Sequence, residues 1–196
     1  MKVEELKDIG AGKACAIIGG GRSLNGVVLS KIKKDITIIS CNMHGWDFAQ
    51  IAIYYDREAG DEMYRTYDWK QKIILAYDIV LRACHAERIP DVYSYRPSRE
   101  TGIQFGDTGY HALQIADQIL GFASIYLIGL DYSATTESYH HNEIRSDDRK
   151  LEAFIDHSIG RVLPKIEAYQ PKAKVFIGSW PSAIKRFQHS RECYES

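Results

Sequence analysis

Residues 15–24 decide the fold of this chain and read Cys-Ala-Ile-Ile-Gly-Gly-Gly-Arg-Ser-Leu. A short apolar run leads directly into three glycines, and a serine and a helix-compatible stretch follow. This order predicts a buried strand that turns onto the N-terminus of a helix, where glycines let the backbone approach a ligand and free N–H groups favour negative charge. The spacing matches neither the GxGxxG dinucleotide fingerprint nor the Walker pattern. A phosphate-binding turn and a tight turn without a ligand both remain open.

Composition limits the class of protein and its partners. With 196 residues and a formal net charge of −1, we expect one domain and no large nucleic-acid footprint. The N-terminus lacks the apolar region of a signal peptide, and no run reaches the length of a membrane span, so we expect a cytoplasmic protein. None of the cysteines are paired at metal-ligand spacing. The oligomeric state is left open, a homo-oligomer included.

Apolar runs alternate with longer amphipathic segments along the whole chain. Several runs are continuously apolar, as expected of strands covered on both faces. Residues 72–77 are either a strand or the beginning of a helix that runs to Glu87, and periodicity does not decide between them. The predicted strands cover residues 14–18, 36–40, 51–55, 91–95, 125–128 and 174–177. Strands separated by helices predict an α/β fold, a single Rossmann-like doubly wound domain with a mostly parallel sheet.

Apolar spacing also predicts the helices. One helix is expected over residues 108–120, with Asp107 or Thr108 as its cap, and another over residues 146–169. A final helix is expected to begin near Pro181, because proline fits the first helical turn.

Ligands of a doubly wound parallel sheet bind beyond the carboxyl ends of its strands. Polar and glycine residues gather at these ends, and they are residues 19–23, Asn42, the turn at Tyr55 and Asp56, residues 129–133 and residues 178–182. Their position is the strongest argument in the sequence itself for a ligand-binding site.

Four short motifs, taken together and in order, resemble a known group of proteins. Residues 17–24 are similar to the opening (I/V)-(I/V)-x-G-x-G-P-S-L of bacterial sialyltransferases of the Campylobacter type. They are equally similar to the DUF115 group, which contains the archaeal 6-hydroxymethylpterin diphosphokinases (MptE-like). Residues 40–42, Ser-Cys-Asn, resemble the C-N that ends the second strand of these proteins. Residues 107–122 resemble (T)-S/G-G…A…A-x-x-L-G-(Y/F), and residues 125–132 resemble I-Y-L-x-G-x-D-(F/Y). The order and approximate spacing hold from about residue 14 to residue 187.

The resemblance implies roles for individual residues. In the sialyltransferases the glycine turn and the asparagine hold the cytidine nucleotide, a Thr/Ser-Gly turn holds its base or sugar, tyrosines hold the leaving phosphate, and a histidine deprotonates the acceptor. The implied nucleotide- or phosphate-binding residues are Gly19, Gly20, Gly21, Arg22, Ser23, Asn42, Asp107, Thr108, Gly109, Gly129, Tyr132 and Tyr139. The implied catalytic residues are His140 or His141, as general base, and Asp131. The chain departs from the family where Gly20 replaces an asparagine, Arg22 a proline and Ser133 a phosphate-binding tyrosine, which leaves the identity of the ligand open.

Several of these residues have a second interpretation. Asp131 can instead brace neighbouring loops, and His140 and His141 can lie in an exposed polar loop. Asp131, His140 and His141 can also meet around Mg²⁺ or Zn²⁺, although nothing in their spacing requires it. The segment that follows Asn42 contains His44, Trp46 and Asp47, and these side chains either line the pocket or pack within a loop. We expect His111 and His157, which fall in predicted helices, to be structural or exposed.

The sequence therefore leaves two classes of function. The first is a nucleotide-dependent group transferase. Its main form is a sialyltransferase-like glycosyltransferase that uses a nucleotide-activated sugar and no metal, and its alternative is a Mg²⁺-dependent diphosphokinase of the MptE type. The second class is a nucleotide-binding module without transfer chemistry, which the lost tyrosine and the compact length favour. A nicotinamide-binding domain is disfavoured because GxGxxG is absent and Asn42 stands where an acidic residue is expected.

Overall fold

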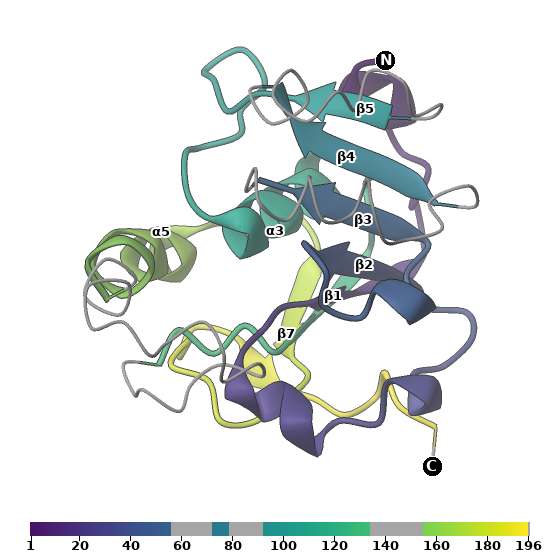
Figure 1. Ribbon diagram of the computed structural model, residues 1–196, viewed down its shortest axis with the longest axis vertical. Coiled ribbons are helices and arrows are strands. Elements are labelled where there is room, and N and C mark those ends of the chain that lie inside the picture. Colours follow the sequence, from purple (N-terminus) through teal and green to yellow (C-terminus); the bar gives the residue numbers. More distant parts are fainter. Residues whose placement is uncertain (56–71, 79–91, 134–154, 196) are drawn as a thin grey trace.

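A parallel sheet organises the structure, which is a computed structural model that describes residues 1–55, 72–78, 92–133 and 155–195 (Figure 1). Within these residues the sheet has eight strands in the order β5-β4-β3-β2-β1-β6-β7-β8, and every pairing is parallel. The strands are β1 (Ala14–Ile18), β2 (Thr37–Cys41), β3 (Ile51–Tyr54), β4 (Ile73–Tyr77), β5 (Val92–Tyr95), β6 (Ser124–Ile128), β7 (Lys174–Ile177) and β8 (Gln188–His189). This confirms the predicted α/β, Rossmann-like fold.

The predicted strands agree with the observed ones to within one residue at each end, and residues 72–77 resolve into the strand β4. The strand β8 was not predicted. It has only two residues, which pair with Phe176 and Ile177, and such a short segment carries no periodic signal.

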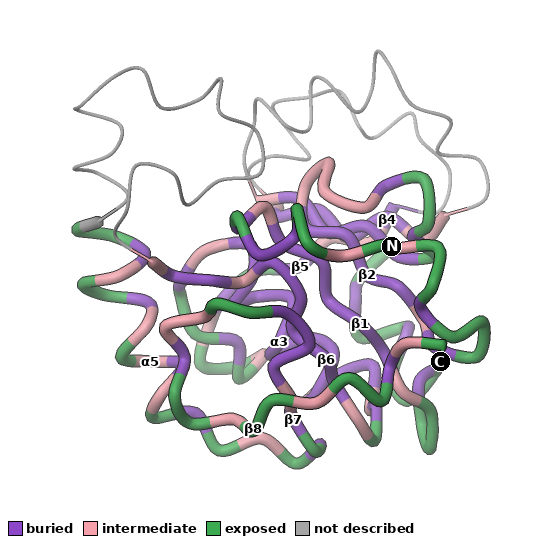
Figure 2. Tube along the Cα trace, turned by 90° about the horizontal axis from the view of Figure 1, so that it is seen from below, coloured by how far each residue is buried: buried purple, intermediate pink, exposed green. Residues whose placement is uncertain are grey.

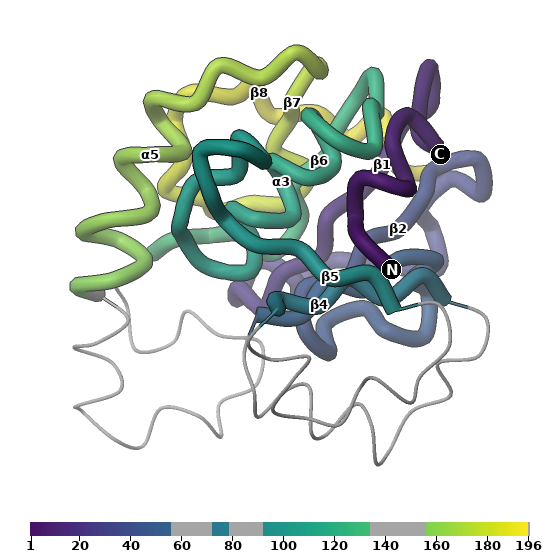
Figure 3. Tube along the Cα trace, turned by 90° about the horizontal axis from the view of Figure 1, so that it is seen from above, coloured from purple at the N-terminus to yellow at the C-terminus, as the bar shows by residue number. Residues whose placement is uncertain are grey.

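The two faces of the sheet are covered by different segments. Side chains alternate between the faces along each strand, so Ile17 packs in the cluster under helix α3 (Thr108–Gln118), whereas Ala16 and Ile18 pack with Leu24 on the opposite face. Helix α3 lies on β1, β2, β3 and β6, and it separates α5 (Leu163–Ala168) from these strands (Figures 1 and 3). Figure 2 shows the central strands and α3 as almost continuously buried.

The observed helices confirm one expectation and correct two. Asp107 is the N-cap of α3, because its side chain accepts a hydrogen bond from the Tyr110 N–H at 2.9 Å. The described part of residues 146–169 is not one α-helix but a π-helix, η7 (Ile155–Val162), followed by α5. The segment after the glycines is a 3₁₀-helix of five residues, η2 (Arg22–Gly26), rather than an α-helix.

No helix begins at Pro181, so that prediction is wrong. The Ala183 N–H donates instead to the carbonyl of Asp131 at 2.7 Å, and the Ser182 hydroxyl donates to the carbonyl of Leu130 at 3.1 Å. Ser182 and Ala183 therefore use these donors to hold the turn after β6, and a connection without regular secondary structure replaces the helix.

Other short helical turns lie outside the sheet. They are the 3₁₀-helices η1 (Val3–Leu6), η3 (Leu29–Lys31) and η4 (Trp46–Phe48).

The order of the strands reverses between β1 and β6. The chain adds β2 to β5 on one side of β1 and then crosses to place β6 on the other side. The turns that leave β1 and β6 diverge at this point, where a doubly wound sheet provides a crevice for a ligand.

Candidate functional site

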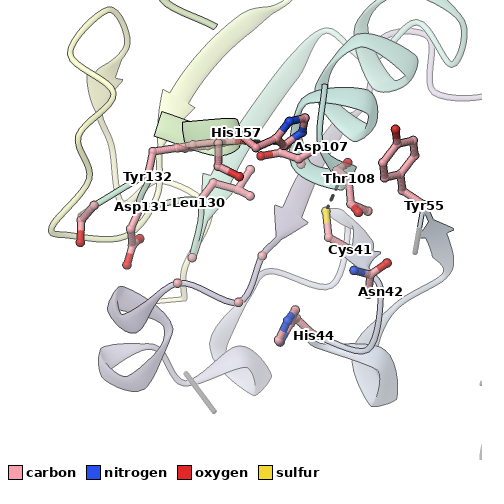
Figure 4. A pocket seen from close by; sticks show the side chains of 17 residues that line it. Cys41, Asn42, His44, Tyr55, Asp107, Thr108, Leu130, Asp131, Tyr132 and His157 are labelled. Atoms are coloured by element: carbon pink, nitrogen blue, oxygen red, sulfur yellow. Dashed lines mark hydrogen bonds between the residues drawn. The ribbon is translucent and has the colours of Figure 1, made fainter. Parts of the chain in front are cut away.

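A cavity of about 360 Å³ opens at the carboxyl ends of β1, β2 and β6, where the strand order reverses. Figure 4 shows that its walls come from separate parts of the chain. Its lining residues are Gly19, Gly20, Gly21, Cys41, Asn42, His44, Tyr55, Asp107, Thr108, Gly109, Gly129, Leu130, Asp131, Tyr132, Ser133, His157 and Ser158. Ten of the predicted site residues lie here: Gly19, Gly20, Gly21, Asn42, Asp107, Thr108, Gly109, Gly129, Asp131 and Tyr132.

The glycine turn packs tightly against the turn after β6. The Gly19 N–H donates to the carbonyl of Ile128 at 2.8 Å, and the Gly21 N–H donates to the carbonyl of Gly129 at 2.6 Å. A Cβ on Gly21 would lie 2.5 Å from Cγ of Asp131 and 2.7 Å from the Gly129 carbonyl oxygen. Gly129 itself has a φ of 66°, in the left-handed region that favours glycine. The contact between the two turns thus requires glycine whether or not a ligand is bound.

Asp131 links the two turns. It is 4% exposed, its Oδ2 accepts from the Ser23 N–H at 2.7 Å, and its Oδ1 accepts from the Ser23 hydroxyl. The Ser179 hydroxyl lies 2.7 Å from that of Ser23 and accepts from the Gly129 N–H at 2.8 Å. Burial raises the pKa of Asp131, and the two hydrogen bonds from Ser23 oppose that rise. Both carboxylate oxygens are therefore engaged in bracing the loops, which is the second interpretation that the sequence left open.

Two predicted phosphate ligands do not line this cavity. Ser23 turns its hydroxyl toward Asp131 and Ser179, and Arg22 is exposed on η2. Residues 178–182 are also outside the lining, although Ser179 and Ser182 hold the turn beside it.

The N-terminus of α3 forms the opposite wall. Oδ1 of Asp107 accepts from the Tyr110 N–H and from the Tyr132 hydroxyl, both at 2.9 Å. Thr108 and Gly109 occupy the first turn, where backbone N–H groups have no acceptor within the helix and the dipole is positive. Burial raises the pKa of Asp107, whereas the Tyr110 N–H, the Tyr132 hydroxyl, the His157 charge and the Ser158 hydroxyl lower it.

The floor of the cavity is formed at the end of β2. Cys41 is buried, and its thiol points to the carbonyl of Thr108 at 4.0 Å. Burial, and then the negative charge of Asp107, raise the pKa of Cys41, so the thiol stays protonated. Asn42 follows with a φ of 53°, and its N–H donates to the carbonyl of Ile53 at 2.8 Å. This left-handed residue turns the chain at the edge of the cavity.

Aromatic rings close the side next to β3. The Tyr55 ring stacks on Tyr77 with a centroid separation of 5.0 Å and meets the buried His111 edge-on at 4.7 Å. His111 is structural, as predicted, because it is fully buried and its Nε2 accepts from the Gly106 N–H at 3.1 Å.

The structure decides between the alternatives for the residues after Asn42. His44 lines the cavity, and its ring lies where a side chain on Gly20 would be. Trp46 is instead buried in the core, 6.2 Å from the Tyr54 ring, and Asp47 is exposed outside the cavity.

His157 is a cavity residue that sequence reasoning assigned only to an exposed or structural position. It is exposed, as expected, but it faces the cavity from the π-helix η7, beside Ser158. Helical periodicity gave no signal for this placement, because η7 meets the cavity only through the tertiary packing of α3 and α5.

Other predictions lie outside the described residues or received no test. Tyr139, His140 and His141 fall in residues 134–154 and remain predictions. Within the described part of the chain, no three His, Cys, Asp or Glu side chains are grouped to hold a metal ion. A search of the same residues finds no helix with the length and apolarity needed to cross a membrane.

Comparison with known proteins gives a match by structure. No family model matches the chain, and no curated protein matches it. The sialyltransferase CstII from Campylobacter jejuni, in complex with cytidine-5′-monophosphate, matches with a TM-score of 0.60 and 16% identity over 95% of this chain and 88% of CstII.

Two further solved structures of sialyltransferases also match this chain. CstII in complex with the substrate analogue CMP-3FNeuAc matches with a TM-score of 0.55 and 17% identity, over 90% of this chain and 85% of that one. The monofunctional α-2,3-sialyltransferase Cst-I from Campylobacter jejuni matches with a TM-score of 0.56 and 14% identity, over 94% and 82%. At such identities the likeness establishes a shared fold.

Proposed function

We propose that the chain is a glycosyltransferase that binds a nucleotide-activated sugar in the cavity between the turns after β1 and β6. The observation that carries the proposal is the convergence of four sequence-distant segments on one cavity, namely residues 19–21, Asn42, residues 107–109 and residues 129–132. These segments are the ones whose motifs resemble the sialyltransferases. The matching CstII structures contain CMP and CMP-3FNeuAc, which supports a cytidine nucleotide as the first ligand to test.

Different residues of the cavity would bind different parts of the nucleotide. The N–H groups of Thr108 and Gly109 suit a phosphate. They belong to the first turn of α3, which lines the cavity, and the helix dipole favours an anion at this end. The Asn42 side chain offers both a donor and an acceptor to a base or ribose. Tyr132 lines the cavity, but its hydroxyl already donates to Asp107, so the predicted Tyr139 supplies the hydroxyl for the phosphate. Because these segments span most of the chain, we take residues 1–196 as a single nucleotide-binding domain.

The proposed reaction is a displacement at the anomeric carbon. The acceptor hydroxyl oxygen forms a bond to that carbon, and the bond from the carbon to the phosphate oxygen breaks. The electron pair leaves with the nucleotide, whose developing charge needs nearby donors. The acceptor proton passes to a base, for which His140 and His141 are the candidates that the sequence supplied.

A thermal-shift screen tests the proposal. CMP, CDP, UDP, GDP, ATP and NAD are each added with and without Mg²⁺. A nucleotide at one hundred times its dissociation constant stabilises the fold by about 2.7 kcal/mol, which for a chain of this length raises Tm by about 5–11 °C. We expect a metal-independent response to CMP or to another nucleotide of a sugar donor.

Other responses would change the conclusion. A response to ATP that requires Mg²⁺ would replace sugar transfer by diphosphate transfer. A nucleotide response without release of nucleotide from any sugar donor would leave a binding module, and silence across the panel would overturn the nucleotide site.

A further inference from the structure

A second, apolar pocket adjoins the candidate site. It has a volume of about 280 Å³, and among the described residues His44 lines both this pocket and the cavity. The described residues that line the pocket are Leu24, Val27, Leu29, Met43, His44, Gly45 and Phe48. They come from the segments that follow β1 and β2, and the turns at the ends of these strands also line the cavity. The pocket therefore extends the candidate site on the side of β1 and β2.

Two glycines allow the His44 ring to lie between the cavity and the pocket. A Cβ on Gly20 would lie 2.6 Å from Cε1 of His44, so a side chain there would displace the ring. Gly45 has a φ of 73°, in the left-handed region that favours glycine, and a Cβ there would lie 3.0 Å from the Ile18 side chain. His44 is thus held beside the glycine turn, as Figure 4 shows.

The walls of the pocket have few groups that could bind a polar ligand. Within the described lining, His44 alone has a side-chain nitrogen or oxygen. The Met43 sulfur, a weak acceptor, already accepts from the Tyr54 hydroxyl at 3.7 Å. A sugar hydroxyl or a base amide would lose its hydrogen bonds to water here without replacement, which costs free energy. The chemistry of the walls therefore selects an apolar group.

The size and exposure of the pocket suit a small apolar group. A cavity of about 150 Å³ with apolar walls binds benzene, so this larger pocket has room for an aromatic ring or a short alkyl chain. Phe48 is 42% exposed, and Val27 and Leu29 are half-buried. Apolar carbon therefore faces water at this pocket, and covering it with an apolar ligand is favourable.

The position of the pocket points to the second substrate of the proposed reaction. The N–H groups that suit a phosphate are at Thr108 and Gly109, on the wall opposite the glycine turn. A donor phosphate bound there leaves the glycine-turn side of the cavity, next to His44, for the acceptor. The pocket begins on that side, so it can receive a part of the acceptor that extends out of the cavity.

We propose that the pocket binds the apolar aglycone of a glycoside acceptor, which is an aryl ring or a short alkyl chain. The inference rests on the proposed sugar transfer. The acceptor sugar lies in the cavity with its reacting hydroxyl toward the donor, and its aglycone passes His44 to contact Leu24, Met43 and Phe48. These contacts orient the acceptor and take no part in the bond changes.

The test measures binding to the full-length chain by isothermal titration calorimetry. The probes are ethyl, butyl and hexyl β-galactosides and the corresponding β-glucosides, each with and without CMP. Phe48→Ala removes a wall of the pocket, and Val27→Phe fills its space. Phe105→Ala is the matched control, because Phe105 is 56% exposed and outside the described lining of both spaces. Thermal unfolding shows that each variant is folded, and the thermal shift with CMP, UDP and GDP measures nucleotide binding.

In the wild type we expect the dissociation constant to fall about fourfold for each CH₂ that enters the pocket, which gives about 15-fold from the ethyl to the butyl glycoside. The gain levels off once the chain is longer than the pocket. In Phe48→Ala and Val27→Phe we expect the gain from ethyl to butyl to fall below about fourfold, the value for a single buried CH₂. Phe105→Ala keeps the full gain, and all three variants bind nucleotide as the wild type does.

The contrary results separate this inference from the proposed function. Equal dissociation constants for the three chain lengths in the wild type overturn the inference, as they would if another segment or a second copy of the chain filled the pocket. The same gain in all four proteins also overturns it, because the alkyl chain then binds elsewhere. In both cases a nucleotide response leaves the proposed function standing. A wild type that shows the gain but binds no nucleotide overturns the proposed function, and with it the role of the pocket in binding an acceptor.

Discussion

His111 makes the stability of this protein depend on pH. Its ring is fully buried, Nε2 accepts from the Gly106 N–H at 3.1 Å, and Nδ1 lies 3.4 Å from the Tyr95 hydroxyl. Because Gly106 donates to Nε2, the proton of the neutral ring is on Nδ1. The Tyr95 hydroxyl in turn donates to the carbonyl of Tyr54 at 3.4 Å. The surroundings are thus arranged for the neutral imidazole.

Burial lowers the pKa of His111 from 6.5 to about 4. The nearby positive charges of Lys165 and His157 lower this pKa further, and the backbone at Gln104, which favours the protonated ring, opposes the decrease. Since the folded pKa lies below the unfolded one, the unfolded chain binds more protons between these values. The contribution to stability is complete above pH 6.5 and is lost as the pH falls toward 4. At about 1.4 kcal/mol per pKa unit, the total is about 3 kcal/mol.

The assay is urea unfolding, followed by tryptophan fluorescence, at several pH values from 7 to 4. Wild type is compared with His111→Gln, whose amide oxygen can still accept from Gly106, and the same substitution at the exposed His189 is the matched control. Asp107 and Asp131 also titrate, but their effects largely cancel in the difference between wild type and variant.

We expect that difference in the free energy of unfolding to shrink by about 3 kcal/mol between pH 7 and pH 4. A difference that stays constant across this range would show that folding does not disfavour the His111 cation, and the argument from burial would be refuted.

Two further predictions concern the turns at the cavity. Gly21→Ala is expected to destabilise the fold by about 1–3 kcal/mol, because the new methyl group would meet Asp131 and the Gly129 carbonyl, whereas Gly26→Ala, with nothing within 4 Å, is the matched control and should change little. Both are measured by urea unfolding, and equal stabilities would contradict the packing argument. Asp131→Ala is expected to cost about 1–3 kcal/mol, because the buried Ser23 N–H loses its acceptor. At 2–4 °C of Tm per kcal/mol the loss is visible by calorimetry, and an unchanged Tm would mean that the bracing contributes nothing.

The sheet could be predicted from the sequence because its strands are covered on both faces. Continuous apolar runs such as residues 14–18 favour a strand without reference to any other part of the chain. At residues 72–77 the same kind of run is compatible with a helix, and only the pairing with β3 decides the outcome. The strand β8 depends wholly on pairing, since two residues hold no pattern.

Two of the failed helix predictions share a physical cause. The segments after Gly21 and after Pro181 both give their backbone donors to the turn that follows β6, through the Ser23 and Ala183 N–H groups. A local helix preference does not indicate that a distant turn will accept hydrogen bonds from these N–H groups. His157 was missed for a related reason, because its position at the cavity depends on how η7 packs in the tertiary structure.

The glycine triplet can serve either the packing of two turns or the binding of a phosphate. The hydrogen bonds of the triplet support the first role and favour another position for a phosphate. The N–H groups of Gly19 and Gly21 already donate to the carbonyls of Ile128 and Gly129, so neither can donate to a ligand without breaking the contact between the turns. The donors that a buried phosphate needs are better supplied by the first turn of α3, at Thr108 and Gly109. On this argument the glycines let two turns meet at the strand reversal, and the N-terminus of α3 lines the cavity where we propose that a nucleotide binds.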